Sequence, residues 1–194
     1  MFRSKEKSQL KVDATNRKRA AYQASKTKAG RHQKEKEEKE KTALSSVDLL
    51  VMLKNCSNFL GVFAVDEIKN LSIKNFPSFF ILNIMERKYQ NGHWISLRID
   101  RQKIEIFDSL GCEPSNWGHY PLSLFQFLNS YSQSHSFIVT PLLQPAYSSL
   151  CGYYCAFFIL ARQKNTFRKL LKHFTRDLDR NDKILCDQLS KYID

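Results

Sequence analysis

Residues 151–174 read CGYYCAFFILARQKNTFRKLLKHF, and this stretch decides the fold of the chain. Its beginning is apolar on every side and its later part is basic, and the whole pattern predicts one long helix over residues 152–174. A helix that starts without a polar face is buried, so its start is expected at the centre of the domain. The expected fold class is therefore α+β, a mixed β-sheet packed on a central helix that starts at Cys151.

Shorter periodic segments surround this helix. Residues 93–99 and 103–107 alternate apolar with polar side chains, and they predict a hairpin that turns around Arg101 and Gln102. Residues 45–48 have the residue types of an N-terminal helix cap. Similar patterns predict further strands at 79–85 and 137–140, and helices at 49–53, 122–131 and 184–193.

The register of this hairpin brings a histidine and an aspartate together. With a two-residue turn, Ile95 lies opposite Asp108, and His93 lies diagonal to Asp108 on the same face of the sheet. A slip of one residue would put His93 and Asp108 on opposite faces, so the prediction depends on parity. A carboxylate bonded to one ring nitrogen fixes the tautomer of the imidazole, and the other nitrogen can then take a proton from a thiol.

Cys151 is the candidate nucleophile. It precedes Gly152 at the expected helix start, where unpaired backbone amides and the helix dipole favour a thiolate. Gly152 is expected to let a substrate backbone pass close to the sulfur. Cys155, one helical turn further along, is interpreted as a small buried apolar residue, as most free cysteines are.

Gln144 lies seven residues before Cys151. A side-chain amide at this place can donate to the oxyanion that forms when a thiolate attacks a carbonyl, with the backbone amide of Cys151 as the second donor. Together with His93 and Asp108, these residues predict the site of a papain-type cysteine peptidase. A zinc site is not expected, because Cys151 and Cys155 lack a second pair of ligands with matching spacing.

Positive charge is concentrated at the start of the chain. The formal net charge of the 194 residues is +12, and residues 1–44 hold 14 Lys and Arg against 6 Asp and Glu. This segment has almost no core-forming residues, so we expect a disordered basic tail over 1–44 and a peptidase domain over 45–194. A cationic tail attracts polyanions, which makes DNA an expected partner, although such a segment can also be merely solubilising.

The cysteine pattern and the lengths of the apolar stretches indicate the cellular compartment in which the protein is expected. The five cysteines are an odd number, widely scattered, and do not have the pattern of a disulfide framework. The start of the chain lacks the apolar stretch of a signal peptide, and no run reaches the roughly 18 apolar residues of a membrane span. The protein is therefore expected in a reducing compartment, neither secreted nor bound to a membrane.

These residues resemble the adenovirus protease (adenain) family, including its relatives in Maverick/Polinton and adintovirus-type elements. The resemblance runs from about Val47 to Arg162. It rests on residues 58–63 (NFLGVF) with Asp66, on Gly92-His93-Trp94, on residues 106–108 (IFD), and on Gln144 with residues 151–155 (CGYYC).

The resemblance implies the adenain fold, with Cys151 as nucleophile, His93 as base, Asp108 as third member and Gln144 as oxyanion residue. It also implies a cysteine endopeptidase, expected as a monomer, that cleaves viral precursor proteins after a Gly-containing motif during particle maturation. The expected locations are then the host nucleus and the virion. No cofactor is expected for the chemistry itself, and DNA is a candidate activator.

The chain departs from adenain at three places. Adenain has Glu where this chain has Asp108, and Asp is usual in the related SUMO proteases. Where adenain has the cysteine that binds an activating peptide through a disulfide, this chain has Gln133, so a disulfide-linked peptide is not expected. The basic tail has no counterpart in adenain.

Two other functions stay open at this point. The same catalytic residues fit a deSUMOylating or deubiquitinating isopeptidase of the same clan, although a chain of this length has little room for a large docking surface. The basic tail by itself fits a DNA-binding particle protein, which would leave the spacing of the four candidate residues a coincidence.

Overall fold

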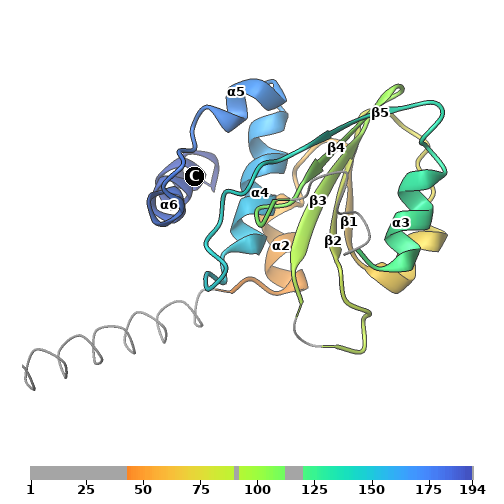
Figure 1. Ribbon diagram of the computed structural model, residues 1–194, viewed down its shortest axis with the longest axis horizontal. Coiled ribbons are helices and arrows are strands. Elements are labelled where there is room, and N and C mark those ends of the chain that lie inside the picture. Colours follow the sequence, from red (N-terminus) through yellow and green to blue (C-terminus); the bar gives the residue numbers. More distant parts are fainter. Residues whose placement is uncertain (1–42, 90–91, 112–119, 194) are drawn as a thin grey trace, which may run out of the picture. The chain divides into compact units, whose positions relative to one another are not determined.

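The computed structural model of the chain describes residues 43–89, 92–111 and 120–193, and their side chains up to Leu189. The predicted tail lies outside the described residues, except for Ala43 and Leu44. The described part is a five-stranded mixed sheet with helices on both faces (Figure 1). This is the predicted α+β class, and the central helix begins at Cys151 as expected.

The sheet has the strand order β1-β2-β3-β4-β5. The central strand β3 pairs antiparallel with both β2 and β4, whereas the edge strands β1 and β5 pair in parallel with β2 and β4. Sequence patterns did not predict β1, because Gly61 (φ +128°) and a shift of register break its alternation. The strands are β1 (Phe59–Ala64), β2 (Ser78–Asn83), β3 (Trp94–Ile99), β4 (Lys103–Phe107) and β5 (Ser136–Val139).

Helices cover the two faces of the sheet unequally. On one face α4 (Cys151–Arg162) packs against β3, with α2 (Ser46–Leu53) beside it and α6 (Leu178–Ile193) on its outer side. The other face is covered by α3 (Leu122–Asn129) and the 3-10 helix η1 (Val65–Asn70). A hydrophobic core therefore lies on each side of the sheet. In the described part of the chain, we find no helix with the length and apolar character to cross a membrane.

The prediction of one long helix over residues 152–174 is wrong. The helix ends at Arg162, and a separate short helix, α5 (Phe167–Leu171), follows it. The hydroxyl of Thr166 accepts a hydrogen bond from the amide of Lys169 and so caps a new helix start. The last helix also begins at Leu178, earlier than the expected residue 184.

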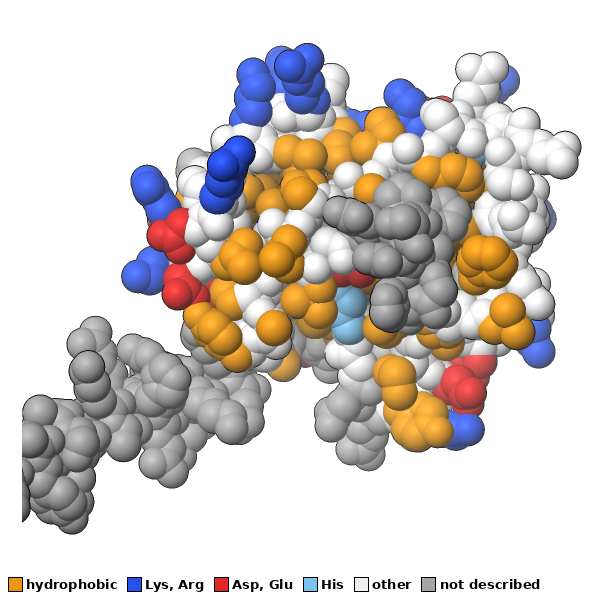
Figure 2. All heavy atoms as spheres, viewed as in Figure 1, with side chains coloured by type: hydrophobic (Ala, Val, Ile, Leu, Met, Phe, Trp, Pro, Cys, Tyr) orange, Lys and Arg blue, Asp and Glu red, His pale blue; other side chains and the backbone are white. Residues whose placement is uncertain are grey.

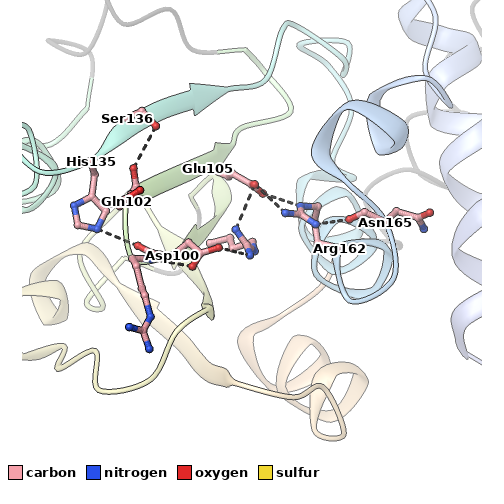
Figure 3. A network of polar contacts seen from close by, with 9 residues as sticks. Asp100, Gln102, Glu105, His135, Ser136, Arg162 and Asn165 are labelled. Atoms are coloured by element: carbon pink, nitrogen blue, oxygen red, sulfur yellow. Dashed lines mark hydrogen bonds and ion pairs between the residues drawn. The ribbon is translucent and has the colours of Figure 1, made fainter.

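A buried cluster of charges ties the sheet to the end of α4 (Figure 3). Arg162 binds the carboxylate of Glu105 through two nitrogens, at 2.7 and 2.9 Å. Arg98 lies beside them, 3.4 Å from Glu105 and 2.7 Å from Asp100. Glu105 on β4 is only 3% exposed, so its bonds to Arg162 are shielded from water. Arg162 is the last residue of α4, and these bonds therefore anchor α4 at the end opposite to Cys151.

Candidate active site

Cys151 is the first residue of α4 and opens into a cleft. The residue before it, Leu150, takes the N-cap position and makes no side-chain capping bond. The first amides of a helix have no carbonyl partner within that helix, so the N–H of Cys151 is available to a bound group. The residue is buried but lines the wall of the cleft, as an attacking thiol must.

His93 and Asp108 meet as the hairpin register predicts. Ile99 pairs with Ile104, which is the pairing that a turn at residues 101 and 102 requires. His93 immediately precedes β3 and Asp108 immediately follows β4, and the ring Nε2 lies 2.7 Å from the carboxylate Oδ1. Because Nε2 is engaged by the carboxylate, Nδ1 is the ring nitrogen left for the thiol of Cys151.

Asp108 is fixed by more than His93. Its Oδ1 also accepts from the amide of Leu110 at 2.9 Å, and its Oδ2 accepts from the hydroxyl of Tyr120 at 2.9 Å. Its backbone N–H donates to the hydroxyl of Thr140, which donates in turn to the Asp108 carbonyl. The carboxylate is therefore held in one orientation and remains an acceptor for His93.

The pKa values of His93 and Asp108 move in the directions of an ion pair. Burial lowers the pKa of His93, but hydrogen bonds with Asp108 and Cys151 outweigh burial and raise this pKa to about 9. Burial raises the pKa of Asp108, but the hydrogen bond and charge of His93, together with the hydrogen bonds from Tyr120 and Leu110, outweigh burial and hold this pKa below its usual range. Near neutral pH the site therefore holds an imidazolium between a carboxylate and the thiol sulfur.

This arrangement predicts the alkaline limit of activity. If His93 gives its proton to a leaving amine, kcat/KM should fall as pH rises through about 9, where the imidazolium is lost. In Asp108→Asn the ring loses its charge partner while burial still lowers its pKa, so the fall should move to lower pH by more than about one unit. Profiles of kcat/KM against pH for both proteins test this, and superimposable alkaline limbs would contradict the pairing.

Gln144 lies in the same cleft as Cys151 and His93. Its side-chain oxygen accepts from the hydroxyl of Ser109 at 2.5 Å, and its Nε2 donates to the carbonyl of Ser148 at 2.6 Å. An amide nitrogen carries two protons, so one N–H of Gln144 is left over for a bound oxyanion. The structure thus brings all four predicted site residues together, which makes nucleophilic attack by a thiol on a carbonyl feasible.

The cleft has a volume of about 540 Å³, and its walls come from segments far apart in the sequence. One wall is the strap Ala43–Ser46, where the carbonyl of Leu44 accepts from the indole of Trp94 at 3.1 Å. A Cβ at Gly152 would lie 3.0 Å from the Cβ of Leu44. The space that we assigned to a passing substrate backbone at Gly152 is therefore filled by Leu44.

Sequence patterns missed several residues of the site. Tyr120, Ser109 and Thr140 hold Asp108 or Gln144, yet no short motif singles them out. The only signal was position, since Ser109 directly follows Asp108 at the end of a strand. Leu44 was placed on the tail side of the domain boundary, although it packs against the core beside Trp94.

The three other cysteines in the described part of the chain have no comparable setting. Cys155 is 1% exposed inside α4, and burial raises the pKa of its thiol well above the usual value. Burial also raises the pKa of Cys56 and Cys186. Within residues 43–89, 92–111 and 120–193, no group of three or more His, Cys, Asp or Glu side chains is placed to hold a metal ion.

Comparisons with known proteins give a weak likeness of fold. The sequence matches no protein-family model, and no curated protein matches it. One similar solved structure is the ASFV pS273R protease (21% identity, TM-score 0.37). The match covers 59% of this chain and 43% of the length of that protease. Another is the SUMO protease Ulp1 with its catalytic cysteine oxidised to a sulfinic acid (16% identity, TM-score 0.39); it matches over 80% of its chain and 78% of this one. Both TM-scores are below 0.5, so the function proposed below rests on the geometry of the site.

Proposed function

We propose that the chain is a cysteine endopeptidase. The observation that carries this proposal is the position of Cys151 at the start of a buried helix, in the cleft that it lines together with His93, whose ring Asp108 holds at 2.7 Å. The thiolate attacks the scissile carbonyl, and the oxyanion accepts hydrogen bonds from the side chain of Gln144 and the N–H of Cys151. The imidazolium of His93 then protonates the leaving amine, and water later releases the acyl group from the sulfur.

Viral precursor proteins, cut after a Gly-containing motif during particle maturation, are the substrates that we propose. The resemblance of the His93, Asp108, Gln144 and Cys151 motifs to adenain supports this class, and with it a monomeric enzyme of the host nucleus and virion. The second candidate is an isopeptidase acting on ubiquitin-like proteins. It is favoured by Asp108, the residue usual in SUMO proteases.

A panel of substrates separates these two activities. The full chain is incubated with fluorogenic peptides that carry Gly-Gly or Gly-x-Gly before the scissile bond, and with SUMO and ubiquitin fusion proteins. An endopeptidase cleaves the peptides with little gain from an attached ubiquitin-like fold, whereas an isopeptidase strongly prefers the fusions. No cleavage of any substrate, together with no reaction of Cys151 with a thiol probe, would leave the DNA-binding particle protein as the better interpretation.

We also propose that DNA binds through the basic tail. Its support is the charge of residues 1–44, with 14 Lys and Arg against 6 Asp and Glu. A second cationic surface lies on and around α5, where Lys and Arg side chains gather (Figure 2). Its exposed members are Lys164, Arg168, Lys169, Lys172 and Arg176.

Removing residues 1–42 should weaken DNA binding and reduce its dependence on salt. Each phosphate contact contributes about −0.9 to the slope of log K against log [salt], so losing six contacts flattens the slope by about five. The truncation keeps Leu44, which belongs to the wall of the cleft, so peptidase activity without DNA should change little. Affinity for a duplex is measured at several salt concentrations.

The matched control is the full chain with Arg168, Lys169 and Lys172 replaced by Gln. These side chains are exposed, so the triple variant should fold. If the tail binds DNA, the control retains the slope of the unchanged chain. A slope that is unchanged by the truncation and flattened by the control would place the DNA site on α5 instead.

A further inference from the structure

The peptide bond between Leu143 and Gln144 is held on both of its polar sides. Its N–H, which belongs to Gln144, donates to the carbonyl of Ser109 at 2.8 Å. Its carbonyl, which belongs to Leu143, accepts from the side-chain amide of Asn181 at 2.9 Å. The plane from which the Gln144 side chain departs therefore has one defined orientation. Half of that restraint comes from α6, a helix whose described side chains, up to Leu189, do not line the cleft.

The side-chain amide of Asn181 is buried, and each of its hydrogen-bonding groups has a partner. It is 0% exposed, and its Nδ2 donates to the carbonyls of both Leu143 and Thr175. Its Oδ1 accepts from the amide of Thr175 at 2.7 Å and from the Thr175 hydroxyl at 3.2 Å. Both protons and the oxygen of this side chain are in use, which makes it a rigid support inside the protein.

Tyr154 supports the same carbonyl from the helix that carries the nucleophile. Its hydroxyl lies 3.2 Å from the carbonyl of Leu143 and 3.0 Å from the carboxylate of Asp182, and its single proton is shared between these two acceptors. Burial, and then the charge of Asp182, raise the pKa of Tyr154 well above the usual value, so the hydroxyl stays a donor. Tyr154 lies one helical turn after Cys151.

We propose that Asn181 and Tyr154 are positioning residues for the oxyanion donor. They hold the Leu143 carbonyl and thereby fix the backbone from which the Gln144 side chain extends. The side-chain N–H of Gln144 that Ser148 does not use then points at the substrate oxygen that becomes negative when Cys151 attacks. Both side chains are fully buried and outside the cleft, so they act through Gln144 and not on the substrate. This inference rests on the proposed peptidase function.

Tyr154→Phe is the principal test, because it removes one hydroxyl and keeps the packed ring. Loss of an oxyanion donor costs roughly 100- to 1000-fold in rate, so a misaimed donor should lower kcat by about tenfold, with KM unchanged. In a Gln144→Ala background the same change should have no further effect, because the donor that it aims is gone. Kinetics of all four full-length proteins are measured on a fluorogenic Gly-Gly peptide.

Two controls separate positioning from general damage. Alkylation of Cys151 by iodoacetamide forms no oxyanion, so its rate should be the same in Tyr154→Phe as in the unchanged protein. Tyr131→Phe is the matched substitution, since Tyr131 packs on Phe127 of α3 and lies outside the cleft. It should leave kcat unchanged.

The outcomes that would overturn the proposal are distinct from failure of the peptidase function. An unchanged kcat in Tyr154→Phe would overturn the proposal. So would a fall in kcat that is equally large with and without the Gln144 side chain, or an equally large fall in the alkylation rate of Cys151. Asn181→Ala should reproduce the non-additive loss of kcat; if it does not fold, Tyr154→Phe alone decides. Full peptidase activity in Cys151→Ala would instead contradict the proposed peptidase mechanism, whatever the kcat of Tyr154→Phe.

Discussion

Replacing Cys151 by alanine should lower kcat/KM by roughly 10⁴-fold or more, because in the proposed mechanism the sulfur forms the acyl intermediate. His93→Ala should cost nearly as much. The double variant should be little worse than either single one, since nucleophile and base act as one unit. Cleavage of a fluorogenic Gly-Gly peptide by the full chain measures all three effects.

Cys155→Ala is the matched control for this experiment. Cys155 lies on the same helix, but it is completely buried and its raised thiol pKa keeps it unreactive. We expect most of the activity to remain. If Cys155→Ala and Cys151→Ala lost activity equally, with folding intact in both, the assignment of the nucleophile would be wrong.

Glu105→Gln should be strongly destabilising although it lies away from the active site. The carboxylate of Glu105 neutralises Arg162 and lies 3.4 Å from Arg98; the side chains of Arg162 and Arg98 are 11% and 12% exposed. Removing one partner of a buried ion pair leaves an uncompensated charge, which typically costs about 3–5 kcal/mol. Asp100 remains as a partner for Arg98 alone. Urea unfolding at neutral pH measures the loss.

The control for this prediction is Glu86→Gln, which removes one partner of a surface ion pair. Glu86 and Lys88 lie 2.7 Å apart, but their side chains are 48% and 64% exposed. Water screens such a pair, so unfolding should not change measurably. Equal effects of Glu86→Gln and Glu105→Gln would show that the buried cluster contributes nothing beyond surface charge.

Local patterns were sufficient for much of the fold. The alternation of residues 93–107 and the length of its turn predicted the register of β3 and β4, and with it the contact of His93 and Asp108. The cap at Ser45 is confirmed, with its hydroxyl accepting from the amide of Asp48. The break between α4 and α5 was missed, because Thr166 caps a helix inside a stretch whose apolar period continues.

By itself, the sequence determined the fold class, the helix start at Cys151 and the side of the hairpin on which His93 and Asp108 lie. Each of these follows from periodicity, residue type or the parity of a turn, which are properties of neighbouring residues. Tertiary structure alone decided that Nε2 of His93 faces Asp108 and that Leu44 fills the space above Gly152.

Only tertiary structure, too, brought Ser109, Tyr154 and Asn181 to the segment around Gln144. These contacts join the segment after β4 and the helices α4 and α6 to residues up to 38 positions away. A hydrogen bond between distant segments depends on the packing angle of whole elements and on side-chain rotamers. Neither packing angles nor rotamers produce a periodic pattern in the amino-acid sequence.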